Sequence, residues 1–295
     1  MRDFKVAFRQ YLELEKKYSA HTVLAYLDDI GFFETFLEEN LGAPLLDQVE
    51  YGQIRSWIVA MSDLGFENVT INRKISSLKA FYKFLMKIKA VEVSPLLKHK
   101  SLKTPKKIQI PFSEKELEQV LSAIEYPLGF EGIRDKLIID LFYATGIRRS
   151  ELINLKVKDI DSASLKVLGK RNKERIIPIL DVIKTQIQAY LLERSQLEVL
   201  LDDGFLFLSN KGVKLTESFV YRLINKYFSH VSEKVKRSPH ILRHTFATHL
   251  LNNGADLNSV KELLGHSSLA STQVYTHSSL AELKKVYGSA HPRGR

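Results

Sequence analysis

The first hundred residues contain four segments in which apolar side chains recur every three or four positions. This spacing places the apolar residues on one face of a helix, so each segment is expected to form an amphipathic helix. Ser19 can cap the second helix, and Gly65 follows the end of the third. The four apolar faces consist of Phe4, Phe8, Tyr11 and Leu12; Val23, Tyr26, Leu27, Ile30, Phe33 and Leu37; Ile54, Trp57, Ile58 and Met61; and Ile71, Ile75, Leu78, Phe81, Tyr82 and Leu85. Short connections between such helices predict a four-helix bundle.

From about residue 112 the pattern is again mostly helical, with one β element. Residues 165–168 and 175–179 are short β-rich runs on either side of a turn at 169–173, and FLFL at 205–208 is a third candidate strand. Residues 98–111 (KHKSLKTPKKIQIP) have no periodicity, two prolines and five lysines, which is typical of a linker. We therefore expect a mainly α protein, with a helical domain at 1–97, a basic linker at 98–111 and a mixed α/β domain at 112–295 that carries a small three-stranded sheet.

Composition indicates the class of partner. Lys and Arg number 44 against 34 Asp and Glu, which gives a net charge of +10. Such an excess favours a polyanion, because each phosphate neutralised releases counterions, although a basic surface also serves solubility.

The absence of cysteine excludes thiol catalysis, disulfides and cysteine-based zinc sites. No apolar run approaches the roughly 18 residues of a membrane span, and the charged N-terminus is unlike a secretory signal, so we expect a cytoplasmic protein with no membrane partner.

The polar face of the fourth helix and the linker carry candidate DNA contacts. These are Asn72, Arg73, Lys74, Lys79, Lys103 and Lys106. Together they form a basic, hydrogen-bonding surface suited to a phosphate backbone or a groove. A solvated helix face would have the same composition, so both interpretations stay open.

In TGIRRSEL (145–152) an apolar helix ends at Gly146 and a new helix begins near Arg148. An arginine at a helix start is electrostatically unfavourable, because the helix N-terminus is already positive. Either a bound anion such as phosphate or an ion pair with Glu151 would compensate it, and the sequence favours neither.

A later segment, SPHILRHTFATHLLNNG (238–254), has the terminal signals of a helix. His240 and Arg243 lie three apart and share a face of its first turn, as a pair that handles phosphate would. His244 and His249 could indicate a metal, but no acidic residue accompanies them at metalloprotease spacing. At the hairpin tip, Lys170 lies among other basic residues and could reach over a bound strand, although most such turns are merely solvated.

Taken together, five segments resemble the tyrosine recombinase family, the site-specific recombinases that include the phage integrases. They are SAHTVLAYLDDIGFF (19–33), TGIRRSEL (145–152), GKRNKER (169–175), HILRHTFATHL (240–250) and LLGHSSLASTQVYTH (263–277). Their order and spacing also fit, the resemblance covers essentially the whole chain, and it is close to the bacterial Xer branch. It implies an N-terminal SAM-like core-binding domain and a catalytic domain that close around duplex DNA.

The resemblance also implies the chemistry. Tyr275 would attack a DNA phosphate and form a 3′-phosphotyrosyl bond, while Arg148 and Arg243 hold the non-bridging oxygens of the pentavalent transition state. Because the tyrosyl link conserves the phosphodiester energy, no ATP is expected; the two arginines could replace a metal, so no cofactor is expected.

Three further residues take supporting roles by the same resemblance. His266 would be a third donor to the phosphate, His240 would exchange a proton with the tyrosine, and Lys170 would protonate the departing 5′-oxygen. The family commonly has Gly-Lys-Gly in the hairpin where this chain has Gly169-Lys170-Arg171, so Asn172 would have to adopt the positive φ there.

The implied partners are duplex DNA and a homo- or heterotetramer with a related recombinase on two DNA sites, joined by a C-terminal tail from Ser278 that docks on a neighbouring protomer. A Xer-type role in resolving bacterial chromosome dimers would add a septal DNA translocase. The alternatives are the integrase or invertase of a mobile element, a non-catalytic DNA-binding protein and a metal-dependent nuclease.

Overall fold

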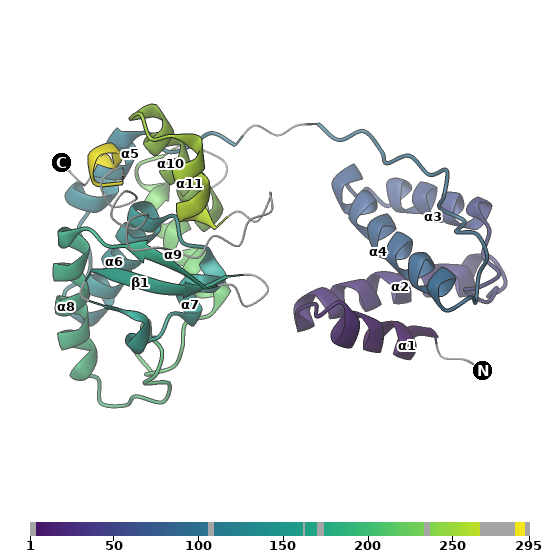
Figure 1. Cartoon of the computed structure of the whole chain (residues 1–295), viewed down its shortest axis with the longest axis horizontal. Helices are drawn as coiled ribbons and strands as arrows, with labels where there is room; N and C mark the ends of the chain where they lie inside the picture. Colours follow the sequence, from purple (N-terminus) through teal and green to yellow (C-terminus); the bar gives the residue numbers. More distant parts are fainter. Residues whose placement is uncertain are drawn as a thin grey trace. The chain divides into compact units, whose positions relative to one another are not determined.

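The computed structural model describes residues 4–105, 109–161, 163–169, 174–232, 237–265 and 287–292. The chain divides into two units, Met1–Lys107 and Ile108–Arg295, and each is described by itself (Figure 1).

The N-terminal unit contains the four helical segments that the apolar pattern predicts. The first is α1 (Phe4–Gln10), which runs into one π-helical turn, η1 (Tyr11–Glu15); the others are α2 (Ala20–Asn40), α3 (Tyr51–Asp63) and α4 (Asn68–Lys87). Ser19 caps α2, as expected, by accepting a hydrogen bond from the main-chain N–H of Thr22. The predicted apolar faces meet in one core, in which Phe8, Phe33 and Trp57 are fully buried.

A buried carboxylate ties α2 to α4. Asp29 is 1% exposed and accepts hydrogen bonds from both terminal nitrogens of Arg73 (2.6 and 2.9 Å), from Lys74 Nζ (3.0 Å) and from Ser77 Oγ (2.7 Å). Lys74 also lies over the ring of Phe32. Because these three side chains surround one charge with four hydrogen bonds, the register of the two helices is fixed by an ionic contact as well as by the apolar core.

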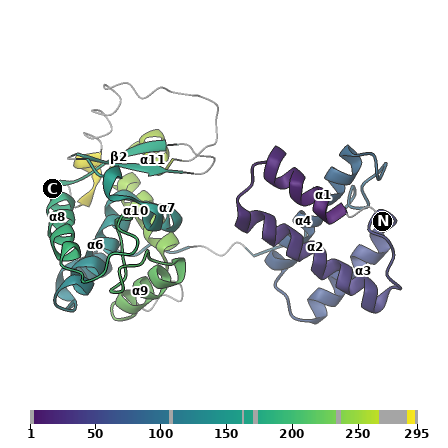
Figure 2. The ribbon, with the colours of Figure 1, turned by 90° about the horizontal axis from the view of Figure 1, so that it is seen from below.

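The C-terminal unit is built around α6 (Phe130–Thr145), whose second half is entirely buried. Both α8 (Asp181–Ser195) and α10 (Pro239–Asn252) pack along α6 (Figures 1 and 2). The remaining elements are α5 (Glu114–Glu118), η2 (Gln119–Ala123), α7 (Arg149–Asn154), η3 (Val157–Asp159), β1 (Ser164–Leu168), β2 (Glu174–Pro178), α9 (Glu217–Ser229) and α11 (Leu257–Leu264).

The sheet is smaller than the sequence predicts. Within the described residues it has two antiparallel strands, β1 and β2, paired so that Val167 faces Arg175. The third strand predicted at 205–208 is wrong: Phe205 bridges only Lys156, and Leu208 bridges only Lys214. Leu206, Phe207 and Leu208 are buried without joining the sheet, and Ile160 makes an isolated bridge with Leu165 of β1.

The described end of the chain packs within its own unit. Tyr287 is buried with Phe246 and Leu250, and its hydroxyl donates to the main-chain oxygen of Ala144. Residues 278–286 lie outside the described part of the chain, and the docking of the tail on a neighbouring protomer stays a prediction. None of the described helices is long and apolar enough to cross a bilayer.

Replacing Asp29 should destabilise the N-terminal unit. We expect Asp29→Ala to lower its free energy of unfolding by about 3 kcal/mol, because the substitution leaves Lys74 and Ser77 without their buried partner. Trp57, the one tryptophan of the chain, lies in this core, so its fluorescence during urea unfolding reports on this unit. The neighbouring, exposed Asp28 provides the control, and Asp28→Ala should change stability by less than about 0.5 kcal/mol. Equal effects of the two substitutions would contradict this account.

Candidate functional site

The turn between α6 and α7 determines where Arg148 lies. Gly146 ends α6 in a left-handed conformation (φ 58°), and a Cβ there would lie 2.4 Å from the ring of Phe246 and 2.9 Å from Leu264. Only glycine therefore allows the turn to lie against α10 and α11. Arg148 follows as the residue that precedes the first turn of α7.

Glu151 neutralises the helix start that the sequence marks as unfavourable. It is 6% exposed, and it accepts hydrogen bonds from the main-chain N–H of Arg148 (2.9 Å) and from Arg148 Nη1 (2.7 Å). Arg175 binds the same carboxylate through both terminal nitrogens, each at 2.8 Å. Burial raises the pKa of Glu151, but the hydrogen bonds and charge of Arg175, followed by those of Arg148, outweigh it and hold the pKa at about 2. The ion pair with Glu151, one of the two interpretations left open, is therefore present.

Three arginines converge on the end of α11. Arg175 Nε donates to the carbonyl of Leu263 (3.2 Å), Arg243 Nη2 to that of Leu264 (2.6 Å) and Arg148 Nη2 to that of Gly265 (3.2 Å). The last carbonyls of a helix have no partner within it and form the negative end of its dipole. In Figure 2, β2 and α11 lie at the same end of the unit, as the hydrogen bond from Arg175 of β2 to Leu263 of α11 requires.

The cluster holds excess positive charge. Three arginines surround one carboxylate, and Arg243 is 7% exposed, with Nη1 donating to the carbonyl of Gly146. Burial, followed by the charge of Arg148, lowers the pKa of Arg243 to about 9, although Glu151 counteracts the shift. Arg243 stays charged at neutral pH, so a bound anion would relieve the repulsion among the arginines.

Of the six predicted catalytic residues, the structure brings Arg148 and Arg243 together. His240 is exposed in the first turn of α10, three residues before Arg243. Lys170, His266 and Tyr275 lie outside the described residues. The sequence places His266 directly after Gly265, where the arginine-bound end of α11 stops.

Arg175 is the residue that sequence reasoning missed. The sequence places it at the start of the β-rich run 175–179 and gives it no role; in the structure it lies in β2, is 6% exposed and binds Glu151. Strand alternation is the signal that could have identified it, because Arg175 and Ile177 share the buried face of β2 whereas Glu174 and Ile176 are exposed.

The two histidines considered for metal binding are placed differently. His249 is buried and hydrogen-bonds the hydroxyl of Tyr143 (3.0 Å), and burial lowers its pKa. His244 is exposed. No group of three or more potential metal ligands occurs among the residues that the structure describes.

The candidate DNA contacts of the N-terminal unit divide into two sets. Asn72 donates to the carbonyl of Leu102 and accepts from its N–H, each at 2.9 Å, so its amide is used to hold the segment after α4. Lys74 is committed to Asp29, and Lys79 Nζ donates to the carbonyl of His99.

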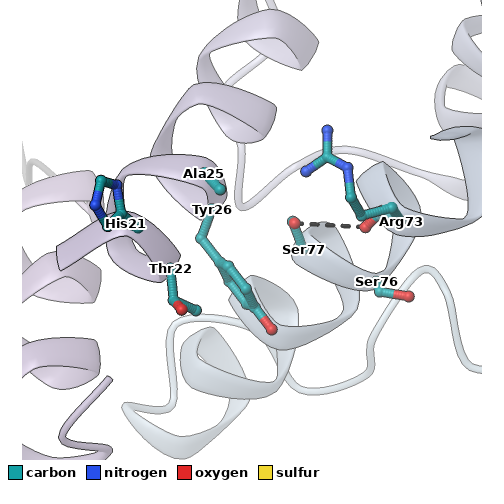
Figure 3. Close-up of a pocket in the computed structure, with 7 residues that line it drawn as sticks. All are labelled: His21, Thr22, Ala25, Tyr26, Arg73, Ser76 and Ser77. Carbon is teal, nitrogen blue, oxygen red and sulfur yellow. Dashed lines mark hydrogen bonds between the residues drawn. The ribbon is translucent and has the colours of Figure 1, made fainter. Parts of the chain in front are cut away.

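Arg73 and Lys103 are more accessible. The Arg73 side chain is 52% exposed although it is bound to Asp29, and Lys103 is exposed as well, whereas Lys106 lies outside the described residues. Arg73 borders a shallow cavity of about 310 Å³ between α2 and α4 (Figure 3). Its lining consists of His21, Thr22, Ala25, Tyr26, Arg73, Ser76 and Ser77. Within this lining, His21, Thr22, Tyr26, Arg73 and Ser76 have side chains that can donate hydrogen bonds to a phosphate or a base edge.

Comparison with known proteins identifies the family of the chain. The chain matches the phage integrase family over residues 86–282 and the N-terminal SAM-like domain of phage integrases over residues 6–89. Tyrosine recombinase XerC of Staphylococcus epidermidis is 41% identical over 291 residues, 98% of this chain and 97% of the relative. Tyrosine recombinase XerC of Bacillus subtilis is 38% identical over 300 residues, 99% and 97% of the two chains.

Solved structures share the fold. The XerH site-specific recombinase bound to palindromic difH substrate has a TM-score of 0.72 at 20% identity and covers 98% of this chain and 82% of its own. The Tn1549 transposon integrase in complex with circular intermediate DNA has a TM-score of 0.69 at 22% identity, with 95% and 98% covered.

The fold and the sequence relationship define a tyrosine recombinase, and this chain belongs to the phage integrase family. Within that family it is a site-specific DNA recombinase of the Xer type. The resemblance seen in the sequence motifs is thereby confirmed.

The stability that Glu151 contributes should depend on pH. Its folded-state pKa of about 2 lies below the ordinary 4.5, so its contribution is present above pH 4.5 and is lost as the pH falls toward 2. The pH-dependent part of this contribution is about 3 kcal/mol. In thermal unfolding of the C-terminal unit, the difference in stability between wild type and Glu151→Gln should therefore be largest near neutral pH and should decrease in acid.

Glu217 provides the matched control, because it pairs with Arg149 on the surface and its side chain is 48% exposed. Glu217→Gln should change stability by less than about 1 kcal/mol at any pH. A gap for Glu151→Gln that stayed constant down to pH 2 would contradict the assignment.

Proposed function

We propose that this protein cuts and rejoins duplex DNA at a specific site through a 3′-phosphotyrosyl intermediate, with Tyr275 as nucleophile. The observation that carries the proposal is the buried excess of positive charge formed by Arg148, Arg175 and Arg243 around Glu151. It lies at the end of α11, directly before the sequence motif that contains His266 and Tyr275.

Two of the arginines can exchange a main-chain carbonyl for a phosphate oxygen. Arg148 keeps 25% of its side chain exposed and makes a long contact (3.2 Å) with the Gly265 carbonyl. Arg243 points its guanidinium at the same turn. Together they would hold the two non-bridging oxygens as negative charge develops in the transition state, which is where preorganised donors contribute most to rate.

The proton and bond changes balance within the proposed site. The Tyr275 oxygen attacks phosphorus and its proton passes to His240, while the bond from phosphorus to the 5′-oxygen breaks and Lys170 protonates that oxygen. His266 adds a hydrogen bond to the phosphate. The reverse sequence, with a 5′-hydroxyl from the partner strand, rejoins the DNA.

The proposed partners follow from the relatives. The XerH and Tn1549 integrase structures are complexes with DNA, which supports duplex DNA as the partner of this chain. We propose a homo- or heterotetramer on two sites, and resolution of chromosome dimers in the bacterial cytoplasm together with a septal DNA translocase. The XerC relatives at about 40% identity favour this role over that of a mobile-element integrase or invertase.

In the N-terminal unit, Arg73, Lys103 and Lys106 are proposed to contact the DNA. The hydroxyls of Thr22, Tyr26 and Ser76, which line the same cavity as Arg73, are proposed to contact it as well. Asn72, Lys74 and Lys79 would act indirectly, because their side chains bind groups of the same unit.

The nucleophile is tested with a nicked suicide substrate, on which a covalent adduct accumulates. Wild type should form an adduct that survives denaturing electrophoresis, whereas Tyr275→Phe should form none while binding the site normally. Tyr221, which is exposed on α9, is the control, and Tyr221→Phe should cleave like wild type. An adduct with Tyr275→Phe, or none with wild type on its cognate site, would refute the proposal.

Arg243 should contribute to cleavage far more than to binding. We expect Arg243→Lys to slow adduct formation by about 100- to 1000-fold, because lysine cannot bind two oxygens at once. Site binding, measured by fluorescence anisotropy, should change by less than about threefold, since most affinity comes from the other phosphate contacts. Arg149→Lys, which alters the adjacent surface pair with Glu217, is the control. Equal losses in binding and cleavage would argue against a transition-state role.

A further inference from the structure

Arg175 is held more completely than the arginines proposed to bind the phosphate. Its two terminal nitrogens bind the two oxygens of Glu151, and its Nε binds the carbonyl of Leu263. Its side chain is 6% exposed, whereas 25% of the Arg148 side chain is exposed. The guanidinium of Arg175 is therefore already occupied by a carboxylate, and its position suits it to orient Glu151 and the end of α11.

The Arg175 side chain is tightly packed against Gly265. Gly265 has a positive φ of 63°, and a Cβ at this position would lie 2.9 Å from Arg175 Cδ and 3.3 Å from its Nε. On the sheet, Arg175 pairs with Val167 of β1, which is also buried. The side chain thus runs from the sheet beneath the last turn of α11 to Glu151.

We propose that Arg175 is a positioning residue of the recombination reaction. It keeps Glu151 ionised and aimed at Arg148, and it fixes the end of α11 at the distance from which Arg148 and Arg243 reach the scissile phosphate. This role rests on the proposed function, because it concerns the same phosphate site.

Arg175 supplies two of the four hydrogen bonds that Glu151 accepts, and Arg148 supplies the other two. The charged groups that face it are Arg148 from the start of α7, Arg175 from β2 and, at longer range, Arg243 from α10, while α11 contributes main-chain carbonyls. A buried carboxylate without Arg175 would retain a proton at higher pH. Once protonated, Glu151 would no longer attract Arg148, which would then be free to leave its oriented position. A misplacement of about 1 Å at a reacting group can cost about 100-fold in rate.

The test uses the full chain on the nicked suicide substrate, with adduct formation followed from pH 5.5 to 9. Arg175→Met keeps the length of the side chain and removes its donors. We expect it to slow cleavage by about 10- to 100-fold while site binding, measured by anisotropy, changes by less than about threefold. Its rate relative to wild type should rise with pH, because the loss of Arg175 raises the pKa of the buried Glu151 and so favours its protonated form in acid. In the double variant Glu151→Gln, Arg175→Met this additional pH dependence should disappear.

Lys166→Met is the matched control. Lys166 lies on the neighbouring strand and pairs with Glu174 on the exposed face, with 53% of its side chain accessible, so its cleavage rate and pH profile should equal those of wild type. Arg175→Lys should restore part of the rate, because it returns the charge without the two-pronged contact.

Several results would overturn the proposal. They are cleavage by Arg175→Met within about threefold of wild type, an unchanged pH profile, or parallel losses of cleavage and site binding that follow a lowered melting temperature. If Arg175→Met does not fold, Arg175→Lys decides: slower cleavage at unchanged binding supports the role, and the wild-type rate refutes it. Failure of wild type itself to form an adduct would refute the proposed function instead, so the two failures are distinguishable.

Discussion

The site depends on the way the last turn of α11 is held. Three successive carbonyls, of Leu263, Leu264 and Gly265, each accept a hydrogen bond from a different arginine. Those arginines come from β2, α10 and the start of α7, so one helix end fixes the relative positions of three elements. The arrangement is favourable because a helix C-terminus carries unpaired acceptors and partial negative charge, and arginine is a permanently charged donor.

The pKa values of Glu151 and Arg243 are both lowered, for different physical reasons. The carboxyl of Glu151 is surrounded by more positive charge than it needs, and its pKa falls to about 2. Burial, followed by the charge of Arg148, lowers the pKa of Arg243 to about 9, and Glu151 offsets only part of this shift. Among the residues that the structure describes, the arginines of the cluster outnumber its carboxylates, and the proposed phosphodiester would supply the balancing negative charge.

The N-terminal unit uses a related arrangement on its surface. Asp29 is buried, like Glu151, and binds an arginine through both terminal nitrogens, but there the arginine remains half exposed. In each unit a buried carboxylate orients a guanidinium by the two-pronged contact, which fixes direction better than a single hydrogen bond. The difference in exposure separates a guanidinium available to a ligand, Arg73, from one enclosed by the protein, Arg175.

The sequence by itself determined the helices, the family and most of the candidate chemistry. Apolar spacing and terminal signals are local properties, so α2, α4 and α10 could be placed without knowledge of their neighbours. Only the tertiary structure decided which polar groups meet. It excluded 205–208 from the sheet, committed the Asn72 amide to Leu102, and brought Arg175 to Glu151, 24 residues away in the chain. These outcomes depend on the energies of contacts between distant segments, and the spacing of apolar residues along the sequence contains no information about those energies.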